Sequence, residues 1–159
     1  MFTDIVGSTS MTERLGDARG VEMVRAHDAL VRRALKEKSG RVVKHTGDGI
    51  MASFDDAVAS VECARSIQQA FEAFNLASKE QLRVRIGIDV GEPIADSNDL
   101  FGATVQTAAR LCQLAEPDTI FVSSAVQNRL KNGFELIKIG PSNLKGFEQP
   151  VDVYAVEWR

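Results

Sequence analysis

The sequence predicts an α+β fold, in which strands and helices share one sheet and hairpins interrupt their alternation. The clearest strand is Leu82–Val90, where apolar and polar residues alternate without a break. Ser10–Lys38 and Asp56–Phe74 instead carry apolar residues at helical spacing. The short segments Arg41–His45 and Ile50–Phe54 flank a Gly-Asp-Gly turn, which is typical of a hairpin. This order favours α+β over a doubly wound parallel sheet.

The N-terminal half begins with a short strand that ends at Asp4, followed by a turn of small residues at positions 7–9. Gly16 and Gly20 weaken the first helical segment, so we expect two helices with a bend between these glycines. Asp55 is expected to cap the helix of residues 56–74.

In the C-terminal half, residues 95–99 are polar and turn-rich, and a third helix is expected from Gly102 to Ala115. On this helix Gln106, Arg110 and Gln113 share the face opposite the packing side. The remaining expected elements are strands at Thr119–Val122, Phe134–Ile139 and Val151–Val156 and a short helix at Ser123–Leu130.

Length and composition fit one soluble globular domain over residues 1–159, because 44% of the residues are hydrophobic and 26% charged. A net charge of −3 makes nucleic acid an unexpected partner. No window is apolar enough for a membrane span, and no signal peptide is recognisable. Cys63 and Cys112 are isolated and are expected to be reduced core thiols, which favours a cytoplasmic setting.

Two aspartates are the first candidates for chemistry. Asp4 follows an apolar run, and Asp48 lies in the turn between two expected strands. If those strands are neighbours, both carboxylates reach one sheet edge, where a cation would offset their repulsion. Oxygen ligands suit Mg²⁺ or Mn²⁺. Taken singly, each aspartate is equally explained by local turn chemistry.

Four stretches carry a resemblance to a known family: FTDIVGST, KHTGDGIMASF, DLFGATVQTAARL and LKGFEQPVDVYAV. In this order, over nearly the whole chain, they resemble the catalytic domain of class III nucleotidyl cyclases. The resemblance implies a ferredoxin-like βαββαβ core with a C-terminal extension. It also implies conversion of a nucleoside triphosphate to its 3′,5′-cyclic monophosphate and pyrophosphate. Because the family has a longer first strand, Met1 is expected to be internal to a longer protein.

The resemblance also implies roles for individual residues. Two Mg²⁺ or Mn²⁺ ions would be held by Asp4, Asp48 and the backbone carbonyl of Ile5. The turn at Gly7, Ser8 and Thr9 would offer N–H groups to a phosphate. Lys44 and Asp99 match the base-reading pair, and their donor and acceptor suit adenine, hence ATP. Arg110 matches the arginine that stabilises the transition state, and Lys145 a lysine that contacts the triphosphate.

Gln106 departs from the family pattern, which has Asn at this position to orient the ribose. The family further implies a homodimer, in which one subunit supplies the metal ligands and its partner the base-reading and transition-state residues. Two alternatives to an active adenylate cyclase remain: a catalytically weak or inactive nucleotide-binding dimerisation module, and a relative of diguanylate cyclases or polymerase palm domains with similar metal chemistry. The turn reads TGDG and lacks the signature of diguanylate cyclases, which disfavours the last.

Overall fold

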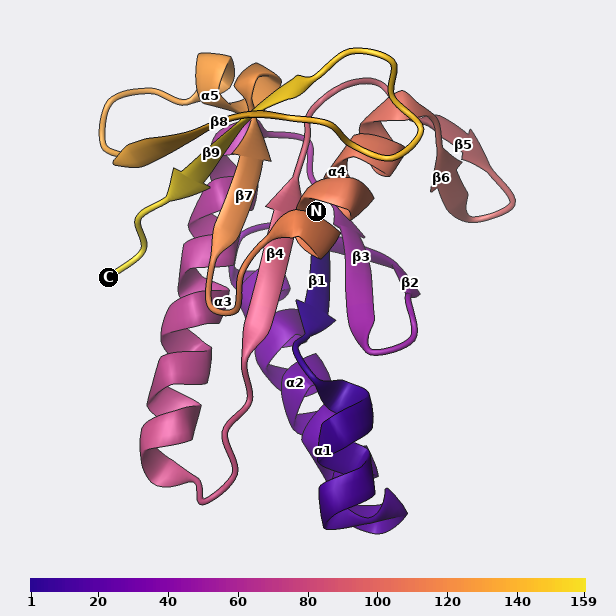
Figure 1. Ribbon diagram of the computed structural model, residues 1–159, viewed down its shortest axis with the longest axis vertical. Helices are drawn as coiled ribbons and strands as arrows, with labels where there is room; N and C mark the ends of the chain where they lie inside the picture. The colour runs from indigo at the N-terminus through magenta and orange to yellow at the C-terminus, as the bar shows by residue number, and fades with distance from the viewer.

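A computed structural model describes the whole chain, residues 1–159, and centres on a seven-stranded mixed sheet (Figure 1). In spatial order the strands run β2-β3-β1-β4-β7-β9-β8. β1 pairs antiparallel with both β3 and β4, and the one parallel pair joins β4 to β7. The strands are β1 (Phe2–Ile5), β2 (Arg41–His45), β3 (Gly49–Ser53), β4 (Val84–Ile88), β7 (Ile120–Ser123), β8 (Leu136–Ser142) and β9 (Val151–Val156).

The first four strands of the sheet form the ferredoxin-like core that the resemblance implied. Helices α1 (Ser8–Leu15) and α2 (Asp17–Glu37) connect β1 to β2, and α3 (Ala57–Ala77) connects β3 to β4. Read along the chain, this is βαββαβ with the spatial order β2-β3-β1-β4. The C-terminal extension adds β7, β9 and β8 beyond β4. The predicted fold class is confirmed.

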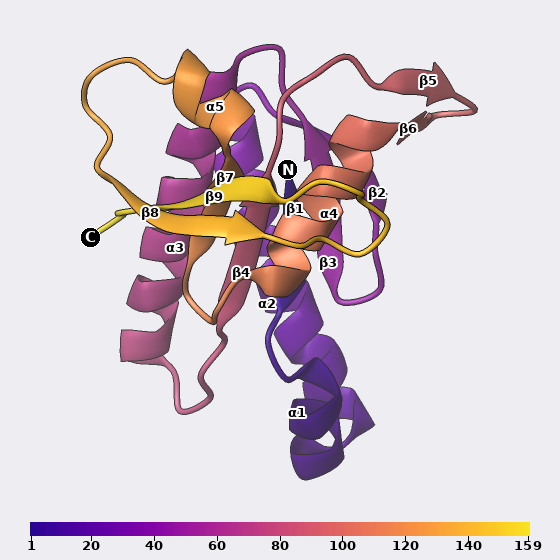
Figure 2. The same ribbon diagram turned by 45° about the horizontal axis from the view of Figure 1, so that its top comes forward.

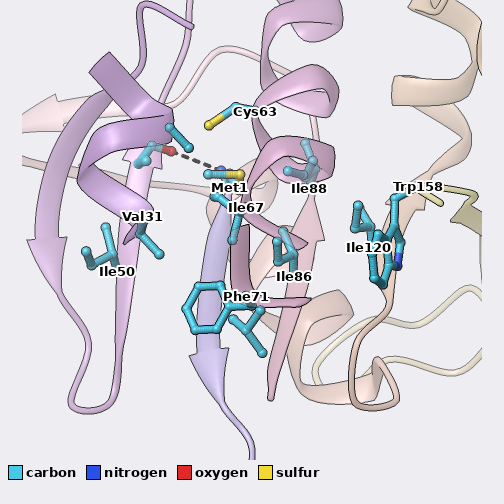
Figure 3. Close-up of a cluster of buried hydrophobic side chains, with 14 of the residues drawn as sticks. Met1, Val31, Ile50, Cys63, Ile67, Phe71, Ile86, Ile88, Ile120 and Trp158 are labelled. Atoms are coloured by element: carbon cyan, nitrogen blue, oxygen red, sulfur yellow. Dashed lines mark hydrogen bonds between the residues drawn. The ribbon is translucent and has the colours of Figure 1, made fainter. Parts of the chain in front are cut away.

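Helices cover both faces of the sheet (Figures 1 and 2). α2 and α3 lie on one face, where Val31, Ile67 and Phe71 pack with Ile86 of β4 in the main core (Figure 3). α4 (Ala103–Leu114) lies on the other face, over a smaller cluster that includes Leu111. Its close approach to β4 requires Gly87, since a Cβ there would lie 2.2 Å from the Cys112 nitrogen.

A two-stranded hairpin, β5 (Ile94–Asp96) and β6 (Asp99–Phe101), projects away from the main sheet just before α4 (Figures 1 and 2). The sequence predicted only a polar turn at residues 95–99, because each strand has just three residues. The turn itself is present, with Ser97 and Asn98 at positive φ. A short helix, α5 (Ser124–Arg129), follows β7.

Several predicted boundaries need correction. The long first helix is broken at Gly16, at one end of the expected bend, where φ is 86°. Asp56, and not Asp55, caps α3, since its side chain accepts from the Ala59 N–H at 3.0 Å. The prediction was wrong because the Asp55 carboxylate pairs with Arg41. Strand β4 is shorter than predicted, and β8 starts two residues later and ends three residues later.

Two further sequence expectations have structural counterparts. Cys63 and Cys112 are free and buried, and burial raises the pKa of each thiol to about 12, so both stay protonated. No helix is at once long and apolar enough to cross a membrane.

Candidate functional site

The register of β1 brings the two candidate metal ligands to one edge of the sheet. Asp4 lies directly opposite Gly49 of β3, and the Ile5 N–H donates to the Asp48 carbonyl at 3.3 Å. Asp48 therefore lies one residue beyond the strand pair, beside the end of β1. The neighbouring strands that the sequence analysis required are present.

The glycines of the TGDG turn have separate steric reasons. Gly47 has φ of 69°, in the left-handed region that favours glycine. Gly49 is needed for close approach, because a Cβ there would lie 1.7 Å from the Thr3 carbonyl oxygen. The turn therefore holds Asp48 against the backbone of β1.

Each aspartate already has a partner within the chain. Arg85, the β4 residue opposite Asp4, donates to Asp4 Oδ2 from Nη2 at 2.8 Å and from Nε at 3.0 Å. The Ser8 hydroxyl donates a hydrogen bond to Asp48 Oδ2. Both contacts use Oδ2, which leaves Oδ1 of each carboxylate for another partner. Arg85 thus offsets part of the negative charge at this edge.

Sequence reasoning assigned no role to Arg85. The alternation of Leu82–Val90 placed it on the face of β4 away from the main core, but only the β1–β4 register puts it opposite Asp4. Thr46 was also missed; it lines, with Asp4 and Arg85, an open pocket of about 200 Å³. The register of the turn, which the sequence does not specify, places Thr46 there.

The donors at this edge fit a hard divalent cation. Asp4 and Asp48 offer carboxylate oxygens, and β1 ends beside them at Ile5, the proposed carbonyl ligand. No cluster of three or more His, Cys, Asp or Glu side chains is present. Protein side chains would thus supply only two ligands, leaving the remaining positions to backbone, water or substrate oxygens, as Mg²⁺ commonly accepts.

The small-residue turn begins helix α1 next to Asp48. Gly7 is left-handed, with φ of 68°, and its carbonyl accepts from the Met11 N–H to close the first helical turn. The first N–H groups of a helix have no partner within the helix, so those of Ser8 and Thr9 are available to an anion. The predicted phosphate-facing turn is therefore also the start of α1, two residues earlier than the predicted helix start.

Lys44 and Asp99, 55 residues apart in sequence, meet across β2 and β6. Lys44 Nζ lies 2.6 Å from Asp99 Oδ2, and the Leu100 N–H donates to Oδ1 at 2.7 Å. The hydrogen bond from Lys44 lowers the pKa of Asp99, and the one from Leu100 adds to this. The pair presents a cationic donor and an anionic acceptor side by side.

The remaining predicted residues lie on α4 and in the segment between β8 and β9. Gln106 is exposed on α4, and Arg110 on the same helix donates from Nη1 to Gln113 Oε1 at 2.9 Å. Lys145 is exposed in the segment between β8 and β9, next to the buried Leu144. None of the three makes a hydrogen bond or ion pair with Asp4 or Asp48.

The ferredoxin-like core with its C-terminal extension matches solved structures of class III nucleotidyl cyclase catalytic domains. The chain belongs to the adenylate and guanylate cyclase catalytic domain family, whose sequence model matches residues 1–157. This family generally uses divalent metal ions.

Individual relatives agree with this assignment. The chain is 30% identical over 158 residues to putative adenylate cyclase 3 of Rhizobium meliloti, covering 97% of this chain and 27% of that protein. It is 31% identical over 130 residues to an adenylate cyclase of Streptomyces coelicolor, covering 81% of this chain and 33% of that protein. The chain thus spans about a quarter to a third of the length of these curated relatives.

A crystal structure of an adenylate/guanylate cyclase/hydrolase from Silicibacter pomeroyi matches 97% of this chain and 92% of its own, with 32% identity and a TM-score of 0.83. The adenylyl cyclase CyaB from P. aeruginosa has a TM-score of 0.85 at 22% identity, covering 98% of this chain and 91% of that one, and so supports the fold alone.

Proposed function

We propose that this chain, as a single catalytic domain over residues 1–159, converts ATP to 3′,5′-cyclic AMP and pyrophosphate. The 2.6 Å contact between Lys44 and Asp99 is the observation that supports ATP as the substrate. Adenine offers a ring nitrogen that accepts from Lys and an amino group that donates to Asp. Guanine has a carbonyl oxygen in place of that amino group, so Asp99 would oppose an acceptor.

In the reaction the ribose 3′-oxygen forms a bond to the α-phosphorus, and the bond from that phosphorus to the pyrophosphate oxygen breaks. The 3′-hydroxyl loses its proton, and pyrophosphate leaves. Such a transfer depends on positioning and charge neutralisation more than on a protein nucleophile. Arg110 supplies positive charge where negative charge grows on the α-phosphate, and Lys145 pairs with the triphosphate.

Two Mg²⁺ or Mn²⁺ ions would be held by Asp4, Asp48 and the Ile5 carbonyl. When bound, such ions neutralise phosphate charge and lower the pKa of the attacking hydroxyl. The chain's own contribution is to orient both carboxylates through Arg85 and Ser8. The start of α1, with Gly7, Ser8 and Thr9, adds N–H groups for a phosphate.

The active unit is proposed to be a homodimer whose two sites each take the metal ligands from one subunit. Within one chain Asp4 and Asp48 form no hydrogen bond or ion pair with Arg110 or Lys145, which supports a contribution from the partner. A further support is the β5–β6 hairpin, where the paired Ile94 and Phe101 leave 67% and 49% of their surfaces exposed. Exposed apolar pairs on a projecting arm are typical of a contact surface.

The test is to incubate the purified protein with ATP or GTP and Mn²⁺ or Mg²⁺, and to identify the products by mass. Cyclic AMP and pyrophosphate are expected from ATP, with Asp48→Asn as an inactive control. Cyclic GMP as the faster product would overturn the base assignment. Nucleotide binding without turnover would instead indicate the regulatory dimerisation module, the alternative that Gln106 favours.

A further inference from the structure

Gln113, near the end of α4, is the residue at which two arginines of the site meet. Arg85 donates from Nη1 to the Gln113 backbone carbonyl at 2.8 Å, while its Nη2 binds Asp4. Arg110 donates from Nη1 to the Gln113 side-chain oxygen at 2.9 Å. Gln113 therefore links Asp4 and Arg85 to Arg110 within one subunit, through its backbone carbonyl on one side and its side chain on the other.

The backbone contact fixes the end of α4. The last carbonyls of a helix have no partner within the helix, and Gln113 is the next-to-last residue of α4. Arg85 satisfies this carbonyl, and its cation suits the negative end of the helix dipole. Together with the close packing at Gly87, this contact sets α4 at a fixed position on β4.

The side-chain contact fixes Arg110 itself. Arg110 and Gln113 are three residues apart on α4, which places them side by side on the helix surface. A free arginine side chain has about 2 kcal/mol of rotamer entropy, so an unheld guanidinium would occupy many positions. The amide oxygen of Gln113 restrains it without adding a charge, which leaves the positive charge of Arg110 available to a phosphate.

We propose that Gln113 is a positioning residue for Arg110, which holds the guanidinium ready for the α-phosphate. This inference rests on the proposed cyclase function and its shared sites. This role requires an uncharged hydrogen-bond acceptor at position 113. A carboxylate would pair with Arg110 and compete with the phosphate, whereas an apolar side chain would release it.

Gln113→Met is the sharpest substitution, because methionine is close to isosteric, lacks the amide acceptor, and leaves the backbone carbonyl for Arg85. In the homodimer we expect kcat for ATP to fall roughly tenfold, below the ~10²-fold that a misplacement of ~1 Å can cost. KM should change little, because Arg110 acts in the transition state. Gln113→Glu should lower kcat further, and both variants should keep the wild-type melting temperature.

Mixed dimers separate positioning from a general structural effect. Asp48→Asn and Arg110→Ala chains, each inactive alone, form one complete site when combined. Gln113→Met on the Asp48→Asn chain affects the working Arg110, so activity should fall roughly tenfold, as in the homodimer. On the Arg110→Ala chain the same substitution has no Arg110 to position, and activity should stay within about twofold of the parent mixture.

Equal losses in the two mixtures would overturn the inference in favour of a structural role, and so would no loss in either. If the parent mixture is inactive although its chains exchange, the shared-site proposal fails on its own account. The homodimer kinetics then decide the role of Gln113. A positioning role would be ruled out if Gln113→Met left kcat unchanged, or if kcat fell and KM rose by the same factor.

Discussion

Lys44 Nζ and Asp99 Oδ2 lie 2.6 Å apart, in an ion pair that joins β2 of the main sheet to β6 of the projecting hairpin. Both side chains are partly exposed, at 46% and 23%. An ion pair this exposed adds little to stability, typically 0–1 kcal/mol. The proposed function assigns this pair to recognition of the base.

The first prediction concerns this pair. Lys44→Glu with Asp99→Cys, a pairing typical of the family's guanylate cyclases, should lower kcat/KM for ATP more than for GTP. The exchange Lys44→Asp with Asp99→Lys is the control, since it keeps an ion pair but reverses donor and acceptor, and it too should lose the preference for ATP. Equal losses for both nucleotides in the first variant would mean that the pair does not read the base.

The second prediction concerns Arg85. Arg85→Gln should lower the free energy of unfolding by roughly 1–2 kcal/mol, because it removes the partly exposed ion pair with Asp4 and the hydrogen bond to the Gln113 carbonyl. Without nucleotide, Mn²⁺ should raise the melting temperature of this variant more than that of the wild type, since the positive charge of Arg85 no longer repels the ion.

Arg83→Gln is the matched control for Arg85. Arg83 immediately precedes β4 and pairs with Asp118, and it forms no hydrogen bond or ion pair with Asp4 or Asp48 through its side chain. The Arg83→Gln variant should show the same Mn²⁺-induced rise in melting temperature as the wild type. If Mn²⁺ raised the melting temperature of both arginine variants equally, Arg85 would not weaken metal binding.

The residues in these two predictions differ in how far the sequence alone could identify them. The resemblance pointed to Lys44 and Asp99, although their direct contact across β2 and β6 became visible only in the structure. Arg85 needed the pairing of β1 with β4, and a register is set by strand neighbours that one sequence does not specify. The strong alternation of β4 revealed its buried face, whereas the three-residue strands β5 and β6 were too short to show a period.

The third prediction compares the two glycines of the TGDG turn. Gly49→Ala should destabilise the fold by about 3 kcal/mol or more, because the new methyl group would overlap the Thr3 carbonyl. Gly47→Ala meets no atom within 4 Å and should cost only about 1–2 kcal/mol for its positive φ. Chemical denaturation measures both. A smaller loss for Gly49→Ala than for Gly47→Ala would contradict the close approach of β1 and β3.

The fourth prediction is a pH dependence that arises from His27, a fully buried residue of α2 to which the sequence assigned no role. Its Nδ1 lies 3.0 Å from Asp28 Oδ1, and its Nε2 lies 3.3 Å from the Thr3 hydroxyl. Burial lowers the pKa of His27, although the hydrogen bond and charge of Asp28 act in the opposite direction.

A histidine with a lowered pKa in the folded state binds its proton more readily when unfolded. The free energy of unfolding should therefore fall as pH drops below about 6.5, the ordinary value, until the folded-state pKa is reached. The slope is at most about 1.4 kcal/mol per pH unit. His27→Gln should lose this slope, whereas His45→Gln, which removes the exposed partner of Asp28, should keep it. A wild-type stability that is flat from pH 7 to 5 would contradict the prediction.

The last prediction concerns Gln106, where the family has Asn. Gln106 and Arg110 lie four residues apart on α4, so both occupy one face of the helix. The extra methylene shifts the amide by about one bond length, and a misplacement of ~1 Å can cost up to ~10²-fold in rate. The additional rotatable bond lets the side chain recover part of this loss. Gln106→Ala should therefore lower kcat at least several-fold, and Gln106→Asn should match or exceed the wild type. If Gln106→Ala turns over as fast as the wild type, this side chain does not position the ribose.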